Sequence, residues 1–308
     1  MKIKKIILIK IFLFPLILLG QQETYYSFYS YNMSLINPAY AGADSEFMFS
    51  LTSRKQWSSI DNAPNTTAFS FSSARKNNVG LGISVISDKV FIEQQTYAYV
   101  DFSYKLEVGN NSKLFLGLKG GGNFYRADPS LLKSYSSQAD PTKIILSEFN
   151  PNIGAGAYLK TPNYWISLSI PRLLNSKRDS NFVVTAKDIV HSYLAAGAYI
   201  KINDKLKLKP SLMLRSIKGL PLTTDITGMI SWQDSFDFGV SFRSNSSMSL
   251  LSMASFGIFD IGFAFETPTE NGLSSLNLKT FELVFRIKLG EGKQSVIEIQ
   301  PDSSEETK

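Results

Sequence analysis

The chain offers few residues that could do covalent chemistry. It has no cysteine and a single histidine, His191, in 308 residues. Ser167, Ser169 and Ser192 are available as nucleophiles for a serine–histidine hydrolase of the kind that works at a lipid interface. The sequence does not show whether any of them meets the imidazole. The simpler interpretation is that His191 is a wall residue near the start of a strand, and we expect no catalytic residue.

Cofactor and metal sites lack support as well. The runs Gly80-Leu81-Gly82 and Gly120-Gly121-Gly122 follow apolar residues. No helical pattern follows either run, so the dinucleotide-binding context is missing. Such glycines more simply let a barrel wall bend or leave room inside it. One histidine without cysteine gives no zinc-ligand set, so the sequence predicts no cofactor and no metal.

The first twenty residues, MKIKKIILIKIFLFPLILLG, combine a basic start with an apolar run that is too short to span a membrane. They predict a signal peptide over residues 1–20 and export from the cytoplasm. The net charge is +6, but four of the lysines lie in this segment. The remaining excess is small, so no nucleic-acid partner is expected.

A period of two dominates the rest of the chain. In Val79–Val85, branched aliphatic residues alternate with Gly and Ser, and Phe281–Leu289 alternates apolar with charged residues. This alternation predicts strands with two different faces, and no stretch has the pattern of an amphipathic helix. We expect 14 strands, near residues 46–55, 66–75, 79–87, 95–107, 112–125, 149–160, 163–171, 190–202, 205–217, 222–232, 235–244, 248–256, 258–267 and 276–289.

Two architectures could hold so many strands: soluble sandwiches, or a closed barrel in the outer membrane. The last strand sets Phe281, Leu283 and Phe285 against charged residues that need water, which a porin-like lumen would supply. Short connections such as 76–78 alternate with longer ones such as 56–65, at least in the first half of the chain, as in outer-membrane barrels. The sequence therefore predicts an all-β fold, a transmembrane antiparallel β-barrel of about 14 strands.

The expected domain organisation has three parts. Residues 21–289 form the barrel with an N-terminal turn segment, and residues 290–308 form a polar periplasmic tail. Aromatic residues near the strand ends are expected at the membrane interface. They are Tyr40, Trp57, Tyr97, Tyr125, Tyr164, Trp165 and Trp232.

Two short phrases stand near the first strand: INPAYAG at 36–42 and RKQW at 54–57. Pro38 fixes φ and removes an amide donor, and Asn37 and Gly42 suit turns. We interpret the first phrase as a plug-like or rim-bound turn that sets the register of the first strand, with partner binding as the alternative. The candidate residues of this partner-binding or structural motif are Asn37, Pro38, Tyr40, Gly42, Arg54, Gln56 and Trp57.

These phrases, followed by Pro64 and Thr66, resemble the start of the PorP/SprF family of type IX secretion outer-membrane proteins. Further similar pieces are Gly80-Leu81-Gly82, Asp88 and HSYLAAG at 191–197. The resemblance covers roughly residues 24–289. It implies a barrel near 14 strands and a role in secretion or gliding motility.

The resemblance also implies partners. They are an exported cargo or adhesin with a C-terminal sorting domain, other type IX secretion components including periplasmic peptidoglycan-associated ones, and outer-membrane lipid. A further hypothesis is that the tail or residues 21–43 contact a periplasmic partner. The leading function is therefore a barrel that binds or anchors an exported surface protein, and the alternatives are a passive porin and a lipid-modifying enzyme.

Overall fold

The computed structural model describes residues 25–44, 46–73, 77–109, 111–131, 145–174, 189–269 and 278–290. The strands are β1 (Phe47–Lys55), β2 (Asn65–Ser72), β3 (Val79–Val90), β4 (Glu93–Glu107), β5 (Lys113–Ala127), β6 (Leu146–Lys160), β7 (Tyr164–Ile170), β8 (His191–Ala198), β9 (Ile200–Lys201), β10 (Leu206–Ile217), β11 (Thr223–Trp232), β12 (Phe236–Arg243), β13 (Ser247–Phe256), β14 (Phe259–Pro268) and β15 (Thr280–Leu289). β8 and β9 both pair with β10 and form one wall strand interrupted at Tyr199.

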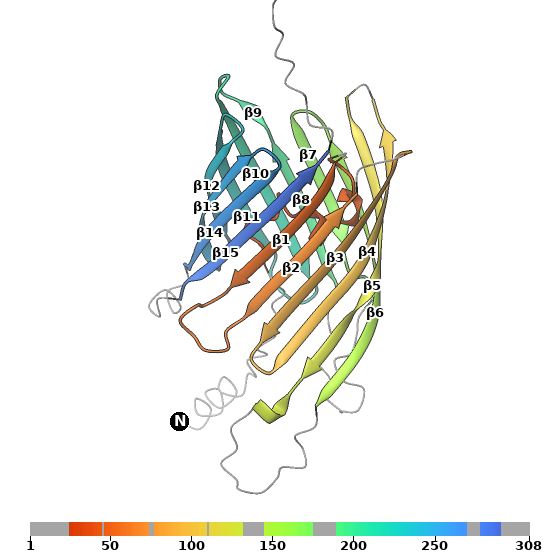
Figure 1. Cartoon of the computed structure of the whole chain (residues 1–308), viewed down its shortest axis with the longest axis vertical. Helices are drawn as coiled ribbons and strands as arrows, with labels where there is room; N and C mark the ends of the chain where they lie inside the picture. The colour runs from red at the N-terminus through yellow and green to blue at the C-terminus, as the bar shows by residue number, and fades with distance from the viewer. Residues whose placement is uncertain are drawn as a thin grey trace, which may run out of the picture.

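The strands close into one antiparallel barrel (Figure 1). Each strand pairs with its neighbours in the sequence, and β15 returns to pair with β1 from Phe47↔Leu289 to Lys55↔Phe281. Closure leaves no sheet edge between the first and last strands, which suits a wall in lipid where backbone groups cannot bond to water. The predicted 14-strand transmembrane barrel is confirmed.

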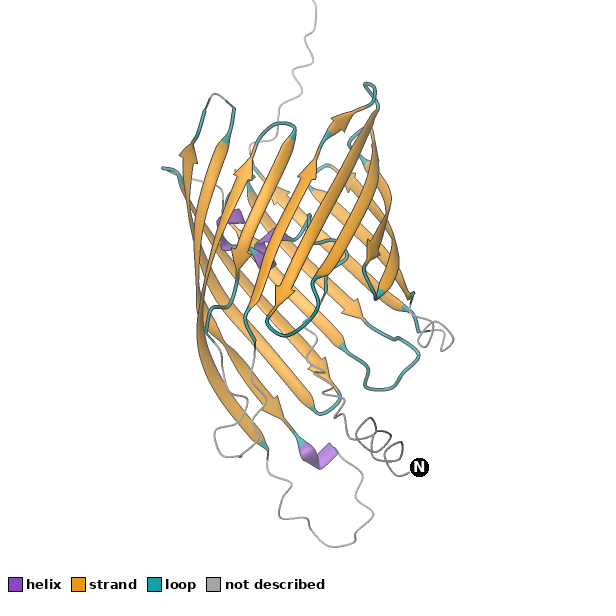
Figure 2. Ribbon diagram, turned by 180° about the vertical axis from the view of Figure 1, so that it is seen from behind, coloured by secondary structure: helices purple, strands orange, loops and turns teal. Residues whose placement is uncertain are grey.

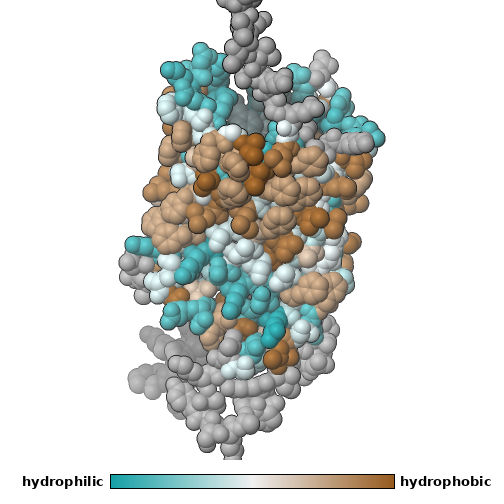
Figure 3. All heavy atoms as spheres, in the orientation of Figure 1, coloured by the Kyte–Doolittle hydropathy of each residue, from teal (hydrophilic) through white to brown (hydrophobic). Residues whose placement is uncertain are grey.

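The two faces of the wall differ as the alternation requires. On β15, Leu283 points outward and is 54% exposed, whereas its neighbour Glu282 points inward and is 0% exposed. Figure 3 shows the outward apolar side chains as a band across the face in view, with hydrophilic residues towards both ends. Among the described residues, no helix has the length and apolar character needed to cross a membrane.

The barrel has two unlike ends. At the turn end, the connections are 73–78, 108–112, 161–163, 202–205, 233–235 and 257–258. At the loop end, they are 56–64, 91–92, 128–145, 171–190, 218–222, 244–246 and 269–279. The long connections all lie at the loop end, although 91–92 and 244–246 there are short. In outer-membrane barrels the long loops are extracellular.

Residues 25–44, which we call the lumen segment, lie inside the barrel. The segment contains the helix α2 (Met33–Ile36) and the 3-10 turn η1 (Pro38–Tyr40). Figure 2 shows these helical pieces enclosed by the strands, whereas the third helical piece, η2 (Pro129–Leu131), lies at the loop end. The wall therefore surrounds residues 25–43, the described part of the stretch 21–43 named above for a periplasmic contact. Most of the connection 128–145 falls outside the described residues.

The lumen segment changes what the interior is made of. From the sequence, water was predicted beside the polar inner face. Instead, the segment brings its own apolar residues, and two clusters form between it and the wall. The larger one contains Tyr26, Tyr29, Met33, Leu35, Ile36, Ala39, Tyr40, Ala43, Ala68, Phe115, Tyr158, Trp165, Tyr193, Ala195 and Met213. The smaller contains Phe28, Met229, Leu251, Met253, Ala264 and Val284.

Three of the aromatic residues expected at the membrane interface belong to the interior. Tyr40 lies on the lumen segment, and Tyr125 and Trp165 point inward from β5 and β7, so all three are buried. Tyr164 and Trp232 are exposed at strand ends, as expected for interface residues. The prediction was wrong for Tyr125 and Trp165 because period two places adjacent residues such as Tyr164 and Trp165 on opposite faces. It was wrong for Tyr40 because η1 lies inside the barrel.

Candidate functional site

The start of the lumen segment is held by charged wall residues near the loop end. The ring of Tyr25 lies between Arg215 and Arg243, whose guanidinium carbons are 3.4 and 4.1 Å from the ring centroid. The next backbone amides, those of Ser27 and Phe28, donate to the Glu282 carboxylate at 2.8 and 3.3 Å. Cation–π contacts and charge-assisted hydrogen bonds thus hold the chain against the inner face of the wall where it enters the barrel.

A buried ionic network supports this anchor. Arg54 bonds to Glu266 at 2.9 Å and to Glu282 at 3.2 Å, and its side chain is only 3% exposed. On the other side, Arg243 bonds to Asp225 at 2.6 Å and lies 3.5 Å from Glu266. Charges this deeply buried are tolerated only when they are paired. The network therefore takes the place of water on the inner face of β1, β11, β12, β14 and β15.

The segment then crosses the lumen. The Tyr29 hydroxyl donates to Ser211 at 2.9 Å, and the Tyr31 hydroxyl donates to Asp237 at 2.6 Å. Asp237 is the second residue of β12, which begins at the turn end. Asn32 turns the chain towards β1 through hydrogen bonds to Ser50 and Thr52.

Asn37, the first polar residue of INPAYAG, fixes the segment to the opposite wall. It is 0% exposed. Its amide nitrogen donates to Ser167 Oγ at 2.7 Å and to the Ala157 carbonyl at 3.0 Å. Its amide oxygen accepts from the Ala39 N–H at 2.9 Å, which caps η1. One side chain thus joins β6 and β7 to the segment and starts its 3-10 turn.

The remaining residues of the phrase complete this turn. Pro38 begins η1, where a missing amide donor costs nothing. The Tyr40 ring meets Tyr158 edge-on at 5.1 Å, and its hydroxyl donates to Asp44 at 2.6 Å. Gly42 has a φ of 68°, which favours glycine, and its amide donates to Ser72. INPAYAG is therefore a turn bound inside the barrel.

Two wall glycines receive this turn. A Cβ atom built on Gly117 would lie 2.2 Å from the Ala39 nitrogen, and one on Gly156 would lie 2.0 Å from Asn37 Oδ1. Only glycine permits such a close approach of the wall to another backbone. Gly117 and Gly156 lie outside the glycine runs singled out in the sequence, and they leave the room that INPAYAG occupies.

Gly117→Val is expected to push the turn off the wall and to lower the free energy of unfolding by about 1–3 kcal/mol, the usual cost of overpacking. Urea unfolding of the protein in detergent, followed by tryptophan fluorescence, measures this. The matched control is Gly120→Val on the same strand, where an added Cβ meets nothing within 4 Å. Equal losses of unfolding free energy in the two variants would contradict the role of Gly117 in receiving the turn.

The structure separates the two phrases. Arg54 is a buried wall residue near the loop end, where Gln56 bonds to Pro64 through its backbone and the Trp57 amide donates to Thr280 Oγ1. INPAYAG lies across the lumen against β5, β6 and β7. The seven candidate residues therefore form no single patch. Four belong to the lumen segment, and of the other three Arg54 supports its start through Glu282. Sequence reasoning missed Tyr25, Glu266 and Glu282, because only the strand register brings them together.

The histidine and serines considered for hydrolysis are wall residues of the barrel. His191 is buried at the start of β8, and Ser167 already accepts a hydrogen bond from Asn37. Ser167 pairs with Ala195, which is four residues, or roughly 13 Å, along the strand from His191. Within the described residues, no group of three or more His, Cys, Asp or Glu side chains could hold a metal ion.

A comparison with protein families identifies the chain. The family described as "Type IX secretion system membrane protein PorP/SprF" matches residues 18–287. The chain belongs to this family. The barrel and its apolar band are those of an outer-membrane protein, and the PorP/SprF family is one of membrane proteins of a secretion system. Neither the family nor the fold is that of an enzyme class.

No curated protein matches this PorP/SprF chain. Among solved structures, it is similar to outer membrane protein Omp33 of Acinetobacter baumannii, with 10% identity, a TM-score of 0.45, and coverage of 79% of this chain and 99% of that one. The CymD monoaromatic hydrocarbon channel has 11% identity, a TM-score of 0.47, and coverage of 82% and 90%. The P. putida toluene transporter TodX has 9% identity, a TM-score of 0.47, and coverage of 84% of this chain and 94% of that one.

Proposed function

We propose that this PorP/SprF barrel binds or anchors an exported surface protein at the outer membrane during type IX secretion. The observation that carries the proposal is the lumen segment. A passive porin conducts through a water-filled interior, whereas here residues 25–44 fill the interior with two apolar clusters and a paired ionic network. A filled barrel with long connections at one end suits a protein that holds a partner there. The partner we expect is a cargo or adhesin with a C-terminal sorting domain.

Purification from the native membrane tests this. In mild detergent, the tagged barrel is expected to bring along an exported surface protein, and removal of the barrel is expected to release that protein into the medium. Mass spectrometry identifies the protein, and an unrelated outer-membrane barrel with the same tag serves as the control. Recovery of the barrel without any surface protein, together with steady ion conduction in planar bilayers, would support the porin instead.

The polar tail, residues 290–308, remains part of the proposal as a contact for periplasmic components of the system. Gly290 follows β15, which ends at the turn end, and short-turn ends face the periplasm in outer-membrane barrels. Residues 25–43 are less suited to this role because the barrel wall surrounds them.

A further inference from the structure

The lumen segment has a definite direction. Tyr25, the first described residue, lies against Arg243, and Arg243 is the last residue of β12 at the loop end. Asp44, near the other end of the segment, bonds at 2.5 Å to Lys160, the last residue of β6 at the turn end. The chain therefore enters from the loop end and leaves at the turn end to begin β1.

The length of the chain before Tyr25 limits where it can go. With the predicted signal peptide ending at Gly20, four residues precede Tyr25, and they span at most about 14 Å. From Arg215, beside Tyr25, to Leu206 at the turn end, β10 runs nine residues, or roughly 30 Å. The processed amino terminus cannot cover this distance back to the turn end.

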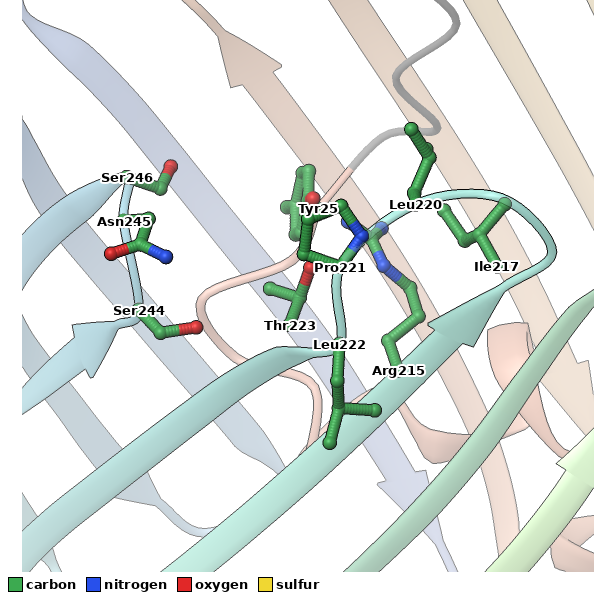
Figure 4. Close-up of a pocket in the computed structure, with 10 residues that line it drawn as sticks. All are labelled: Tyr25, Arg215, Ile217, Leu220, Pro221, Leu222, Thr223, Ser244, Asn245 and Ser246. Carbon is green, nitrogen blue, oxygen red and sulfur yellow. The ribbon is translucent and has the colours of Figure 1, made fainter.

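A pocket lies beside Tyr25 at the loop end. Its volume is about 220 Å³, and it is shared by the lumen segment, the end of β10 and two turns (Figure 4). The turn after β10 supplies apolar side chains, and the turn after β12 supplies polar ones. The lining residues are Tyr25, Arg215, Ile217, Leu220, Pro221, Leu222, Thr223, Ser244, Asn245 and Ser246.

The chemistry of the pocket fits a piece of polypeptide. Leu222 is 55% exposed on the apolar side, and Asn245 on the other turn offers amide groups. Two hydrogen bonds join the turns. The Ser244 amide donates to the Thr224 carbonyl, and the Thr224 amide donates to Ser244 Oγ. The two sides of the pocket therefore keep a fixed spacing. The volume equals roughly seven liquid waters. This is enough for one large side chain and far too little for a folded domain.

We propose that the exported partner docks an extended segment at this mouth, which Tyr25 forms with turns 218–222 and 244–246. The processed amino terminus lies at the same end of the barrel. An apolar side chain of the partner enters the pocket, and its backbone bonds to the polar turn. The docking half rests on the proposed function, whereas the direction of the lumen segment does not.

An epitope tag inserted after Gln22 tests the direction in the full-length protein. Antibody added to intact cells is expected to bind this tag, whereas a tag placed after Lys308 is expected to be reached only after the cells are permeabilised. Detection of the Gln22 tag only after permeabilisation would overturn the inference, whatever partner the barrel has.

A photo-crosslinking residue at Leu220 or Asn245 tests the docking surface. It is expected to capture the exported surface protein, and the same residue at Asn203, in an exposed turn at the other end, is expected not to. Leu220→Asp is expected to lower recovery of the partner about tenfold, because a carboxylate replaces the apolar surface that would meet the partner's side chain. Co-purification with crosslinks from Asn203 alone would overturn the docking surface and leave the proposed function standing. Absence of any co-purifying surface protein would overturn both.

Discussion

Replacing residues 25–43 with a Gly-Ser linker of equal length is expected to turn the protein from a closed barrel into an open channel. In the native barrel, apolar clusters between the segment and the wall occupy the interior. Eight-stranded barrels can fill their interior with wall side chains, whereas wider ones leave an aqueous path. A 14-strand wall without its segment therefore leaves a water-filled lumen. Current recordings in planar lipid bilayers are expected to show discrete open steps for the variant and none for the native protein.

Two controls separate this result from damage to the barrel. The same linker in place of residues 91–92, outside the lumen, is expected to leave the bilayers silent. Circular dichroism of the lumen variant should retain the strand signal, which shows that the wall has formed. A folded variant that stays silent would mean that the wall side chains close the barrel without the segment.

Arg54→Ala is expected to have the largest effect of a single substitution on stability. Arg54 is the common partner of two buried carboxylates, those of Glu266 and Glu282. Its removal leaves Glu282 uncompensated at 0% exposure, and breaking a buried pair in this way costs about 3–5 kcal/mol. Glu282 also holds the Ser27 and Phe28 amides, so the start of the segment should loosen as well. Denaturant unfolding in detergent measures the loss.

Lys55→Ala is the matched control for Arg54→Ala. It removes the same charge from the next residue of β1, but Lys55 points outward and is exposed. The free energy of unfolding is expected to change by less than about 0.5 kcal/mol, as for most surface substitutions. Arg54→Lys should lie between the two, because an ammonium keeps the charge but not the two-armed geometry. Similar losses for Arg54→Ala and Lys55→Ala would refute the role given to the network.

The strands could be predicted from the sequence because each carries its own alternation. Phe281 to Ile287 predicts two faces without reference to any other strand, and the structure places them so. The bounds were less exact: the predicted strand began at 149, whereas β6 starts at Leu146. Pro151 lies inside this strand, as predicted, and pairs with Gly122. Proline is tolerated because β7 pairs only with residues 155–160, which leaves that stretch at an edge.

The candidate site was only partly predictable. Asn37, Pro38 and Gly42 predict a turn from their own backbone preferences, and the turn is present. The sequence did not decide between the inside of the barrel and its rim. That choice depends on Gly117 and Gly156, which leave space more than 70 residues further along the chain. The ionic network was beyond reach for the same reason, since Arg54 and Glu266 become neighbours only after the first and last strands pair.

The pairing of β1 with β15 has a consequence for how the molecule is assembled. Arg54 belongs to the first strand of the wall and Glu282 to the last, so the clasp on Ser27 is complete only when this seam shuts. Closing the wall and securing the start of the lumen segment are therefore coupled, and a loosened seam should release the segment as well.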